Sequence, residues 1–432
     1  MEKILLIYII VFVAAEFIIS SVLSSLNRSW MSHPIPNVLK GIYDSNTYAK
    51  QQRYARECDR IGWIDRVFSF ILTIIVLVTG LLGWLNDAVC VPAFTNPLWQ
   101  LILFLVISQT VMTLIGIPFS YYSTFVVEQR YGFNKTTHRT FWADTAKSFA
   151  LSIVLSSVLI GVIFLLYQTW RDDFWIYALA VCVAVMIFFS MFYSNLIVPL
   201  FNKQTPLEPG ELRSAIEIAV KSAGFSIKDI YVINGSKHST KANAYFTGLG
   251  RTKRVVLYDT LIQQLTTEEI VAVLGHELGH YSHHDTWKML GFNIVYIAVN
   301  FYVFSLLVSN PALPKALGGT QWSFALALVA FSLLFTPIDI ILKPIINWAS
   351  RINEYYADAF AVECGYGKEL ISGLKKLHAN SLSNLTPHPL YIKFHFSHPS
   401  LEQRVIAIQD YDRELSQPND AEYGHYGDDD KK

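Results

Sequence analysis

Long runs of apolar residues recur along the 432-residue chain and alternate with polar segments of unequal length. A run of about 20 apolar residues is long enough for one helix to cross a bilayer. The chain therefore predicts seven membrane-spanning helices, at Ile4–Leu23, Val67–Leu85, Leu98–Tyr122, Ser148–Tyr167, Phe174–Pro199, Met289–Val308 and Trp322–Leu342. The first run is long and continuous, and no small-residue cleavage site follows it, so we expect it to be a retained helix.

The connections between these runs differ in their content of basic residues. The first connection is rich in them, the second, residues 86–96, has none, and the third, residues 123–147, is basic again. The fourth and sixth connections offer only Arg171 and Lys315. Because basic connections stay in the cytosol, this alternation predicts a lumenal or external N-terminus and a cytosolic C-terminus.

The two long polar segments, about Leu200–Lys288 and Lys343–Lys432, are predicted to form one split cytosolic domain. Residues 1–199 would hold the first five spans, 200–288 the first part of that domain, 289–342 the last two spans and 343–415 its second part. Residues 416–432 are polar and acidic, which predicts a disordered tail.

Local patterns inside the split domain predict its elements. Thr266 and Glu269 match a helix capping box ahead of the apolar run that begins at Ile270, and this helix is expected to continue towards the sixth span. The remaining predictions are helices at Pro209–Ala223 and Ser350–Val362 and strands at Asp229–Ile233, Ala244–Gly248 and Arg254–Tyr258.

Composition supports a membrane protein and excludes some partners. Charged residues make up 16% of the chain and hydrophobic ones 52%, whereas soluble proteins carry about 25% charged residues. Lys and Arg balance Asp and Glu at 34 each, so no net charge indicates nucleic acid. Four scattered cysteines have neither metal-ligand nor disulfide spacing.

The chemistry begins with the sequence His276-Glu277-Leu278-Gly279-His280. Histidines four positions apart share one helix face, so both imidazoles can reach a single metal ion. Glu277 lies beside them, where it could take a proton from a water on that metal. Zinc binds imidazole and carboxylate and activates water near neutral pH, so we expect zinc here.

A catalytic zinc site of this kind needs a third protein ligand. The downstream helix offers Glu354 and Asp358, one turn apart, and we assign Glu354 as the ligand and Asp358 as the acceptor of a ligand histidine's distal N–H. Two alternatives stay open. The acidic pair could instead face solvent beside Arg351 or Lys368, and His284, or less readily His283, could extend the histidine series to an all-histidine site.

Other polar residues are candidates on weaker grounds. His398, next to Pro399, and Arg404 follow an aromatic stretch and could stabilise an oxyanion, although a lone histidine beside a proline is usually a loop residue. Four polar residues fall within the predicted spans, where such groups usually face protein or water, which predicts a hydrated interior: Glu16, Asn293, Asn300 and Asp339.

Several linear blocks together resemble the type I CAAX prenyl proteases, integral membrane zinc metalloendopeptidases of gluzincin type. The resemblance spans most of the chain, although His283-His284-Asp285 departs from the family pattern. The blocks are Lys50–Tyr54, Glu128–Thr137, Leu200–Leu207, Asn243–Gly248, the His276–His280 motif, Ser350–Ala361 and Phe396–Pro399.

The resemblance implies a mainly α fold, in which seven transmembrane helices form a barrel around a large chamber closed by an α+β zinc protease domain. It implies one zinc ion per chain, held by His276, His280 and Glu354, with Glu277 as the base and Asp358 as a supporting carboxylate. His398 and Arg404 would bind substrate and stabilise the oxyanion. Asn243 and Ala244 would lie on the strand that pairs with the substrate.

The implied reaction removes the C-terminal tripeptide from prenylated CAAX proteins in the endoplasmic reticulum membrane, with the inner nuclear membrane as a further location. The partners would be prenylated substrates and the lipid bilayer. Two other functions remain open at this stage: a broad-specificity protease for membrane-protein quality control, and a non-enzymatic channel or scaffold with a vestigial metal site.

Overall fold

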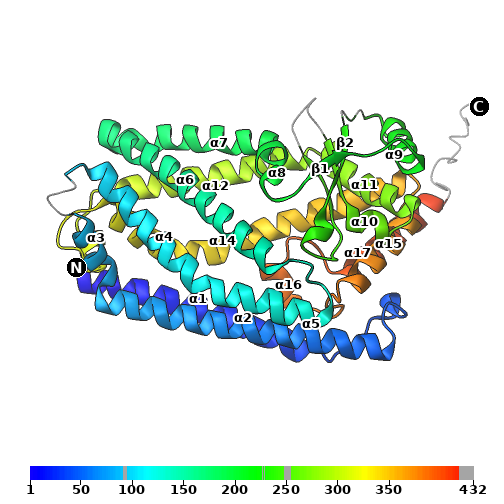
Figure 1. Cartoon of the computed structure of the whole chain (residues 1–432), viewed down its shortest axis with the longest axis horizontal. Coiled ribbons are helices and arrows are strands. Elements are labelled where there is room, and N and C mark those ends of the chain that lie inside the picture. Colours follow the sequence, from blue (N-terminus) through cyan, green and yellow to red (C-terminus); the bar gives the residue numbers. More distant parts are fainter. Residues whose placement is uncertain (91–94, 226, 228, 248–253, 418–432) are drawn as a thin grey trace, which may run out of the picture.

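Long helices make up most of the molecule, and a small sheet with shorter helices lies at one end (Figure 1). The computed structural model describes residues 1–90, 95–225, 227, 229–247 and 254–417. Gly248 and all but the first two residues of the predicted tail lie outside these ranges. The long helices run side by side, with the N-terminus at the end of the molecule opposite the sheet.

The apolar runs form the long helices. Six stretches of the described chain are long and apolar enough to cross a membrane, and one of them, His138–Phe201, contains two predicted spans joined by a short turn, so seven predicted spans fit. The helices of this part are α1 (Glu2–Trp30), α2 (Ser45–Thr79), α3 (Leu81–Val89), α4 (Pro97–Tyr122), α6 (His138–Trp170), α7 (Phe174–Leu196), α12 (Asp285–Leu307) and α14 (Phe324–Glu363).

Short helical segments connect the long ones. They are η1 (Asn37–Leu39), the π-helix η2 (Ser123–Glu128), α5 (Gln129–Tyr131), η3 (Arg171–Asp173), α8 (Val198–Phe201) and α13 (Ala312–Ala316). Buried aromatic side chains fill the space between α4, α6, α7, α12 and α14, with Phe104, Phe164, Phe174, Phe304 and Phe324 at the centre of this core.

The end with the shorter helices is built on a four-stranded sheet in the order β1-β2-β4-β3. β1 (Gln204–Pro206) pairs antiparallel with β2 (Asp229–Ile233), β2 runs parallel to β4 (Arg254–Tyr258), and β3 (Ala244–Thr247) pairs antiparallel with β4. The helices here are α9 (Glu211–Ser222), η4 (Gly235–Lys237), α10 (Asp259–Gln264), α11 (Thr267–Ser282), α15 (Gly367–Asn380), α16 (Pro389–His395) and α17 (Leu401–Ser416).

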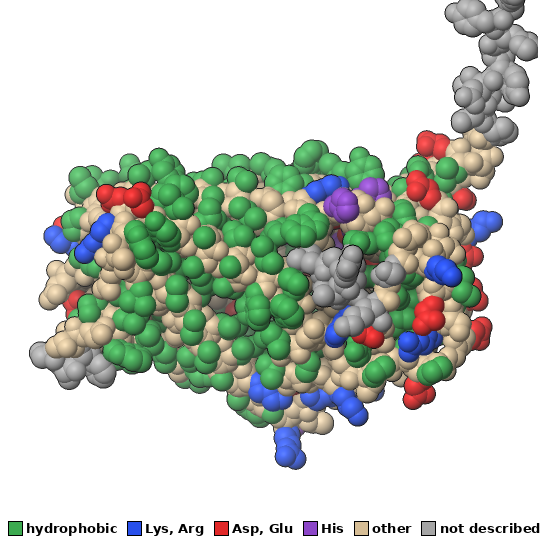
Figure 2. All heavy atoms as spheres, turned by 90° about the horizontal axis from the view of Figure 1, so that it is seen from above, with side chains coloured by type: hydrophobic (Ala, Val, Ile, Leu, Met, Phe, Trp, Pro, Cys, Tyr) green, Lys and Arg blue, Asp and Glu red, His purple; other side chains and the backbone are tan. Residues whose placement is uncertain are grey.

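The surface reflects this division. Figure 2 shows hydrophobic side chains spread over the long helices, whereas charged side chains gather at the end that carries the shorter helices, with a smaller group at the opposite end. Many large apolar side chains of the long helices are exposed, among them Val78, Trp84 and Leu114. Such a surface is stable in lipid and not in water, so the chain is a multi-pass membrane protein.

Three predicted elements differ from the structure. The second predicted span, Val67–Leu85, is divided between α2 and α3 at Gly80, which lies in the left-handed region (φ 66°). The helix that begins after Thr266 does not continue into the sixth span, because α11 ends at Ser282 and α12 starts at Asp285, with His284 in the left-handed region (φ 56°) between them. The helix predicted at Ser350–Val362 is the last part of α14, which is continuous with the seventh span. One continuous helix therefore connects the membrane part to the end that carries the sheet.

Candidate metal centre

The centre forms where α11 crosses α14 at close range. Gly279 makes this crossing possible, since a Cβ atom there would lie 2.7 Å from the Cα atom of Ala357 and 2.9 Å from its carbonyl oxygen. On α11, the capping box is present as predicted: Thr266 accepts from the backbone N–H of Glu269, and Glu269 accepts from that of Thr266. A well-capped helix and a backbone-tight crossing hold the histidines against α14.

Three side chains converge at the crossing. The Nε2 atom of His276 lies 3.5 Å from Glu354 Oε2, and the Nε2 atom of His280 lies 3.3 Å from Glu354 Oε1. One ligand atom from each of the three residues lies within 4.8 Å of the others. His276 and Glu354 are buried, and His280 is partly exposed. These are the three residues assigned as ligands from the sequence.

The donor set fits a metal ion. Glu354 Oε2 is buried and has no hydrogen-bond partner, and a buried carboxylate oxygen that accepts no hydrogen bond is costly. Two imidazole nitrogens and one carboxylate match the ligands of a catalytic zinc site.

The side of the centre at His276 is closed by buried charges. The Nδ1 atom of His276 lies 2.8 Å from Asp358 Oδ1, so its N–H can donate there while Nε2 faces the centre. Arg404, from α17, donates to both oxygens of Asp358, at 2.6 and 2.9 Å. Its remaining nitrogen lies 3.6 Å from Glu354 Oε2. Both Asp358 and Arg404 are buried.

The side at His280 is held by a residue that was not assigned from the sequence. His280 Nδ1 lies 3.0 Å from Asp285 Oδ2, and Lys288 donates to the other oxygen of Asp285 at 3.1 Å. Burial of the ring lowers the pKa of His280, but hydrogen bonds with Glu354 and Asp285 outweigh burial and raise it to about 9. The negative charge of these two carboxylates therefore favours a positively charged group at this position.

Asp285 could have been found from its position. It follows His280 by five residues and begins α12, and the left-handed turn at His284 folds it back onto the ring. The same turn takes His284 out of the helical series that would have made it a ligand. His283 bonds the carbonyl of Gly279 through Nδ1 at 2.8 Å and stacks on Tyr356.

Arg351 does not pair with the acidic residues of its own helix. Its guanidinium donates to the backbone carbonyls of Ile392 and Phe396, at 3.2 and 2.7 Å, and so fixes the segment that leads to His398. The Nδ1 atom of His398 lies 2.7 Å from Glu354 Oε1, although the side chain is 64% exposed. Glu277, one residue after His276, is partly exposed. These two side chains belong to the accessible side of the centre.

β3 lies at one edge of the described sheet, beside α11. In the described sheet β3 has a neighbour only in β4, and Ala244 packs in one cluster with Leu274 and Leu278 of α11. The side-chain oxygen of Asn243 accepts from the N–H of Ala244 at 2.9 Å. The other edge of β3 has no strand neighbour among the described residues, and pairing with an extended peptide at Asn243 and Ala244 stays a prediction.

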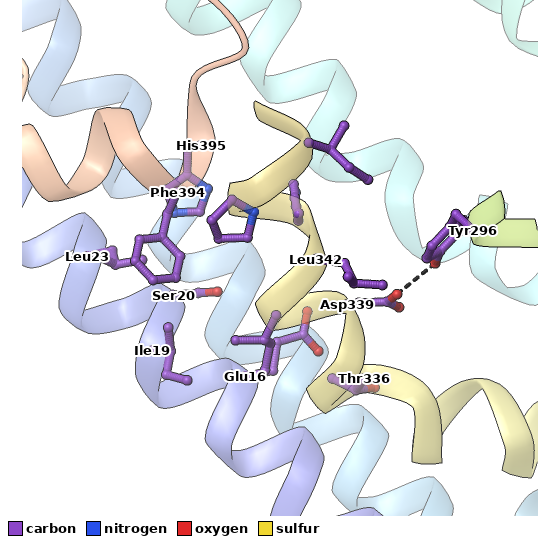
Figure 3. Close-up of a pocket in the computed structure, with 14 residues that line it drawn as sticks. Glu16, Ile19, Ser20, Leu23, Tyr296, Thr336, Asp339, Leu342, Phe394 and His395 are labelled. Carbon is purple, nitrogen blue, oxygen red and sulfur yellow. Dashed lines mark hydrogen bonds between the residues drawn. The ribbon is translucent and has the colours of Figure 1, made fainter. Parts of the chain in front are cut away.

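The polar residues within the spans divide into two kinds. Asn293 and Asn300 donate to carbonyls of their own helix, four residues back. Glu16 and Asp339 line a cavity of about 440 Å³ between the long helices, where Tyr296 donates to Asp339 at 2.6 Å (Figure 3). The two carboxylates line this cavity, and the hydrated interior stays a prediction.

Comparisons with known proteins agree with this arrangement. Residues 26–203 match the family model "CAAX prenyl protease N-terminal, five membrane helices", and residues 206–412 match "Peptidase family M48". The chain is 34% identical to CAAX prenyl protease 1 homolog of Arabidopsis thaliana, over 88% of this chain and 91% of the relative. It is 32% identical to CAAX prenyl protease 1 of Saccharomyces cerevisiae, over 92% and 93%.

A solved structure shows the same fold. The crystal structure of S. mikatae Ste24p superposes with a TM-score of 0.89 at 30% identity, and the match covers 94% of this chain and 99% of that one. The predicted fold class, a membrane helical barrel with a small α+β peptidase domain, is therefore confirmed.

Proposed function

The chain belongs to the CAAX prenyl proteases of peptidase family M48, and on that premise we propose that it removes the C-terminal tripeptide from prenylated CAAX proteins with the help of zinc. The chain is a metalloendopeptidase of a membrane-embedded family. The proposal adds the bond that is cut, the identity of the metal, and the residues that do the chemistry.

One observation carries the assignment of residues. His276 Nε2, His280 Nε2 and the carboxylate of Glu354 converge from two crossing helices, and one oxygen of that buried carboxylate has no hydrogen-bond partner. Each histidine has its Nδ1 atom beside a separate carboxylate, which orients the ring and leaves Nε2 free. This set would hold zinc.

Different residues act on different atoms of the scissile amide and its attacking water. A zinc ion bound here would polarise the substrate carbonyl and acidify a water molecule. Glu277 accepts the proton of the attacking water and delivers it to the leaving amine. His398, accessible and adjacent to Glu354, donates to the developing oxyanion. The edge of β3 at Asn243 and Ala244 pairs with the extended substrate.

For Arg404 we propose a role other than the substrate binding and oxyanion stabilisation expected from the sequence. Its guanidinium is buried behind the ligands and bonded to Asp358, so we assign it to positioning. It holds the Asp358 carboxylate against His276 and contributes positive charge near Glu354 without contacting the substrate.

The variant Glu277→Gln tests the mechanism because it removes the base and keeps the side chain's size. We expect cleavage of a farnesylated CAAX peptide to fall by about 10²- to 10⁴-fold, while the zinc content measured by elemental analysis stays at one per chain. Glu268→Gln, exposed in the first turn of the same helix, is the matched control and should cleave normally. Wild-type turnover in Glu277→Gln would refute the assignment.

Substrate class is tested with two versions of one peptide. The farnesylated CAAX peptide should be cleaved and its unmodified counterpart cleaved poorly, because the isoprenoid contributes apolar burial that the bare cysteine lacks. Equal rates for both would instead favour a broad-specificity protease of membrane-protein quality control.

We also propose the endoplasmic reticulum membrane as the location, with a lumenal N-terminus and a cytosolic C-terminus. The alternation of basic connections supports this orientation. An epitope tag at the C-terminus should be digested by protease added to intact microsomes, and a tag at the N-terminus should be protected. The opposite pattern would reverse the orientation.

A further inference from the structure

Two sequence blocks have no part in the metal centre. Residues 50–54 lie near the start of α2, and residues 128–137 follow the end of the π-helix η2. Both belong to the membrane half of the chain, but both contact a segment of the peptidase half, residues 238–243, that leads directly into β3.

The segment 238–243 belongs to no helix or strand, so contacts with other parts of the chain fix its position. Its backbone bonds residues of the second block in two places: Lys135 N–H donates to the His238 carbonyl at 3.0 Å, and Thr240 N–H donates to the Phe133 carbonyl at 3.0 Å. Beyond Lys241 the chain reaches Asn243 and then the free edge of β3. A shift of this segment would move that edge.

A charged cluster fixes the middle of the segment. The Lys241 ammonium lies 2.9 Å from the Tyr54 hydroxyl and 3.0 Å from Glu128 Oε2, and Tyr54 donates to Glu128 Oε1 at 2.6 Å. The same ammonium lies 4.7 Å from the centre of the Phe133 ring. Charge-assisted hydrogen bonds and a cation–π contact therefore meet at one side chain.

The carbonyl groups of the segment are also held from the peptidase side. Thr260 donates to the Lys241 carbonyl at 3.0 Å, and Gln264 donates to the Thr240 carbonyl at 2.6 Å. The backbone N–H of Tyr258 donates to the Asn243 carbonyl at 3.0 Å. The segment is thus clamped between β4 and α10 on one side and the membrane half on the other, and Lys241 links it to that half through an ion pair.

We propose that Lys241, Glu128 and Tyr54 form a positioning cluster that sets the edge strand β3 for substrate pairing. The inference rests on the proposed function, in which β3 binds the extended substrate. It gives the two blocks a role: they fix the peptide-binding edge to the membrane helices, so that the substrate strand is presented in register with the metal centre.

Strand pairing contributes equally to the bound substrate and to the transition state, so its loss raises KM and leaves kcat unchanged. For Lys241→Met we expect the KM of the farnesylated CAAX peptide to rise roughly threefold to tenfold, the size of effect of a partly exposed charge-assisted pair. Zinc content and kcat should stay at wild-type values. Lys241→Arg should recover part of the loss because it keeps the charge.

Variants of Glu128 and Tyr54 test the other two members of the cluster. Glu128→Gln should raise KM in the same direction, and the double variant with Lys241→Met should be less impaired than the product of the two single effects, because both act through one contact. Tyr54→Phe removes one hydroxyl and should give a smaller rise. Lys221→Met, on an exposed position of α9, is the control and should match wild type.

The outcomes separate this inference from the proposed function. An unchanged KM in both Lys241→Met and Glu128→Gln would overturn the positioning role while leaving the mechanism intact. A fall in kcat or in zinc content at constant KM would also overturn it, since the cluster would then act on the centre itself. Full turnover in Glu277→Gln would instead overturn the proposed function. If Lys241→Met fails to fold, Glu128→Gln and Tyr54→Phe provide the same test.

Discussion

The two ends of helix α11 carry similar residues but serve different purposes. At its N-terminal end, both oxygens of Glu269 are occupied: Oε2 accepts from the Thr266 N–H, and Oε1 accepts from Ser372 and Lys376. At its C-terminal end, the histidines face Glu354, one of whose oxygens has no hydrogen-bond partner.

The difference separates a structural polar cluster from a site. Glu269 is buried and charged like Glu354, but its hydrogen bonds come from the protein itself, so it needs no ligand. The carboxylate of Glu354 and the two histidine Nε2 atoms converge on a common position. The protein does not fill all of their hydrogen-bonding capacity. Convergent and incompletely satisfied groups, supported from behind by satisfied ones, therefore mark the functional end of the helix.

Loss of Arg404 should produce the largest change at the functional end. Arg404→Met leaves Asp358 and Glu354 buried without their cation, and breaking a buried ion pair on one side costs about 3–5 kcal/mol. Thermal unfolding of the metal-free protein in detergent should show a much lower midpoint. Arg404→Lys should be intermediate, because it keeps the charge and loses the two-pronged geometry.

Arg413→Met is the matched control for Arg404→Met. Arg413 lies on the same helix and pairs with Asp410, but its side chain is 71% exposed, so we expect almost no change. Equal midpoints for the two variants would mean that the buried network behind His276 does not stabilise the fold.

The two supporting carboxylates should differ in their effect on metal affinity. Removing a residue that orients a ligand histidine typically weakens metal binding about 10- to 100-fold. Asp358→Asn should weaken zinc binding by about 100-fold, because His276 and its surroundings are buried. Asp285→Asn should weaken it by only about 10-fold, because His280 is partly exposed. Zinc affinity measured by competition with a chelator checks the order, and a larger loss in Asp285→Asn would reverse it.

Features that depend on neighbouring residues could be predicted from the sequence. The capping box, the two histidines and Glu354 were predicted because each depends on spacing within a single helix, and β2 and β4 because their runs of apolar residues are bounded by polar ones. β1 was missed, because its three residues, which include Pro206, are too few for an alternating pattern.

Features that depend on contacts between distant parts of the chain could not be predicted in this way. Arg404 reaches His276 and Asp358 across 128 and 46 positions, and no periodicity reports such a contact. The break between α11 and α12 was missed because His284, rather than a glycine, adopts the left-handed conformation there. The support given by Asp285 follows from that break, so it was missed as well.

The smallest expected effect lies at the structural end of α11, and it depends on pH. Burial raises the pKa of Glu269, but hydrogen bonds from Lys376, Thr266 and Ser372 outweigh it and hold the pKa below its usual value. A carboxyl group whose pKa is lowered by folding stabilises the protein above its unfolded pKa, and this contribution is lost as the pH falls through the folded value.

Glu269→Gln should therefore cost about 1 kcal/mol at pH 7, the size of one net hydrogen bond to a buried group, and leave zinc content unchanged. The gap between the unfolding midpoints of wild type and variant should narrow as the pH falls below about 4, because a protonated glutamic acid and a glutamine are both neutral and similar in shape. A gap that stays constant with pH would show that the charge of Glu269 contributes nothing. A loss of zinc would show that the two ends of α11 are not independent.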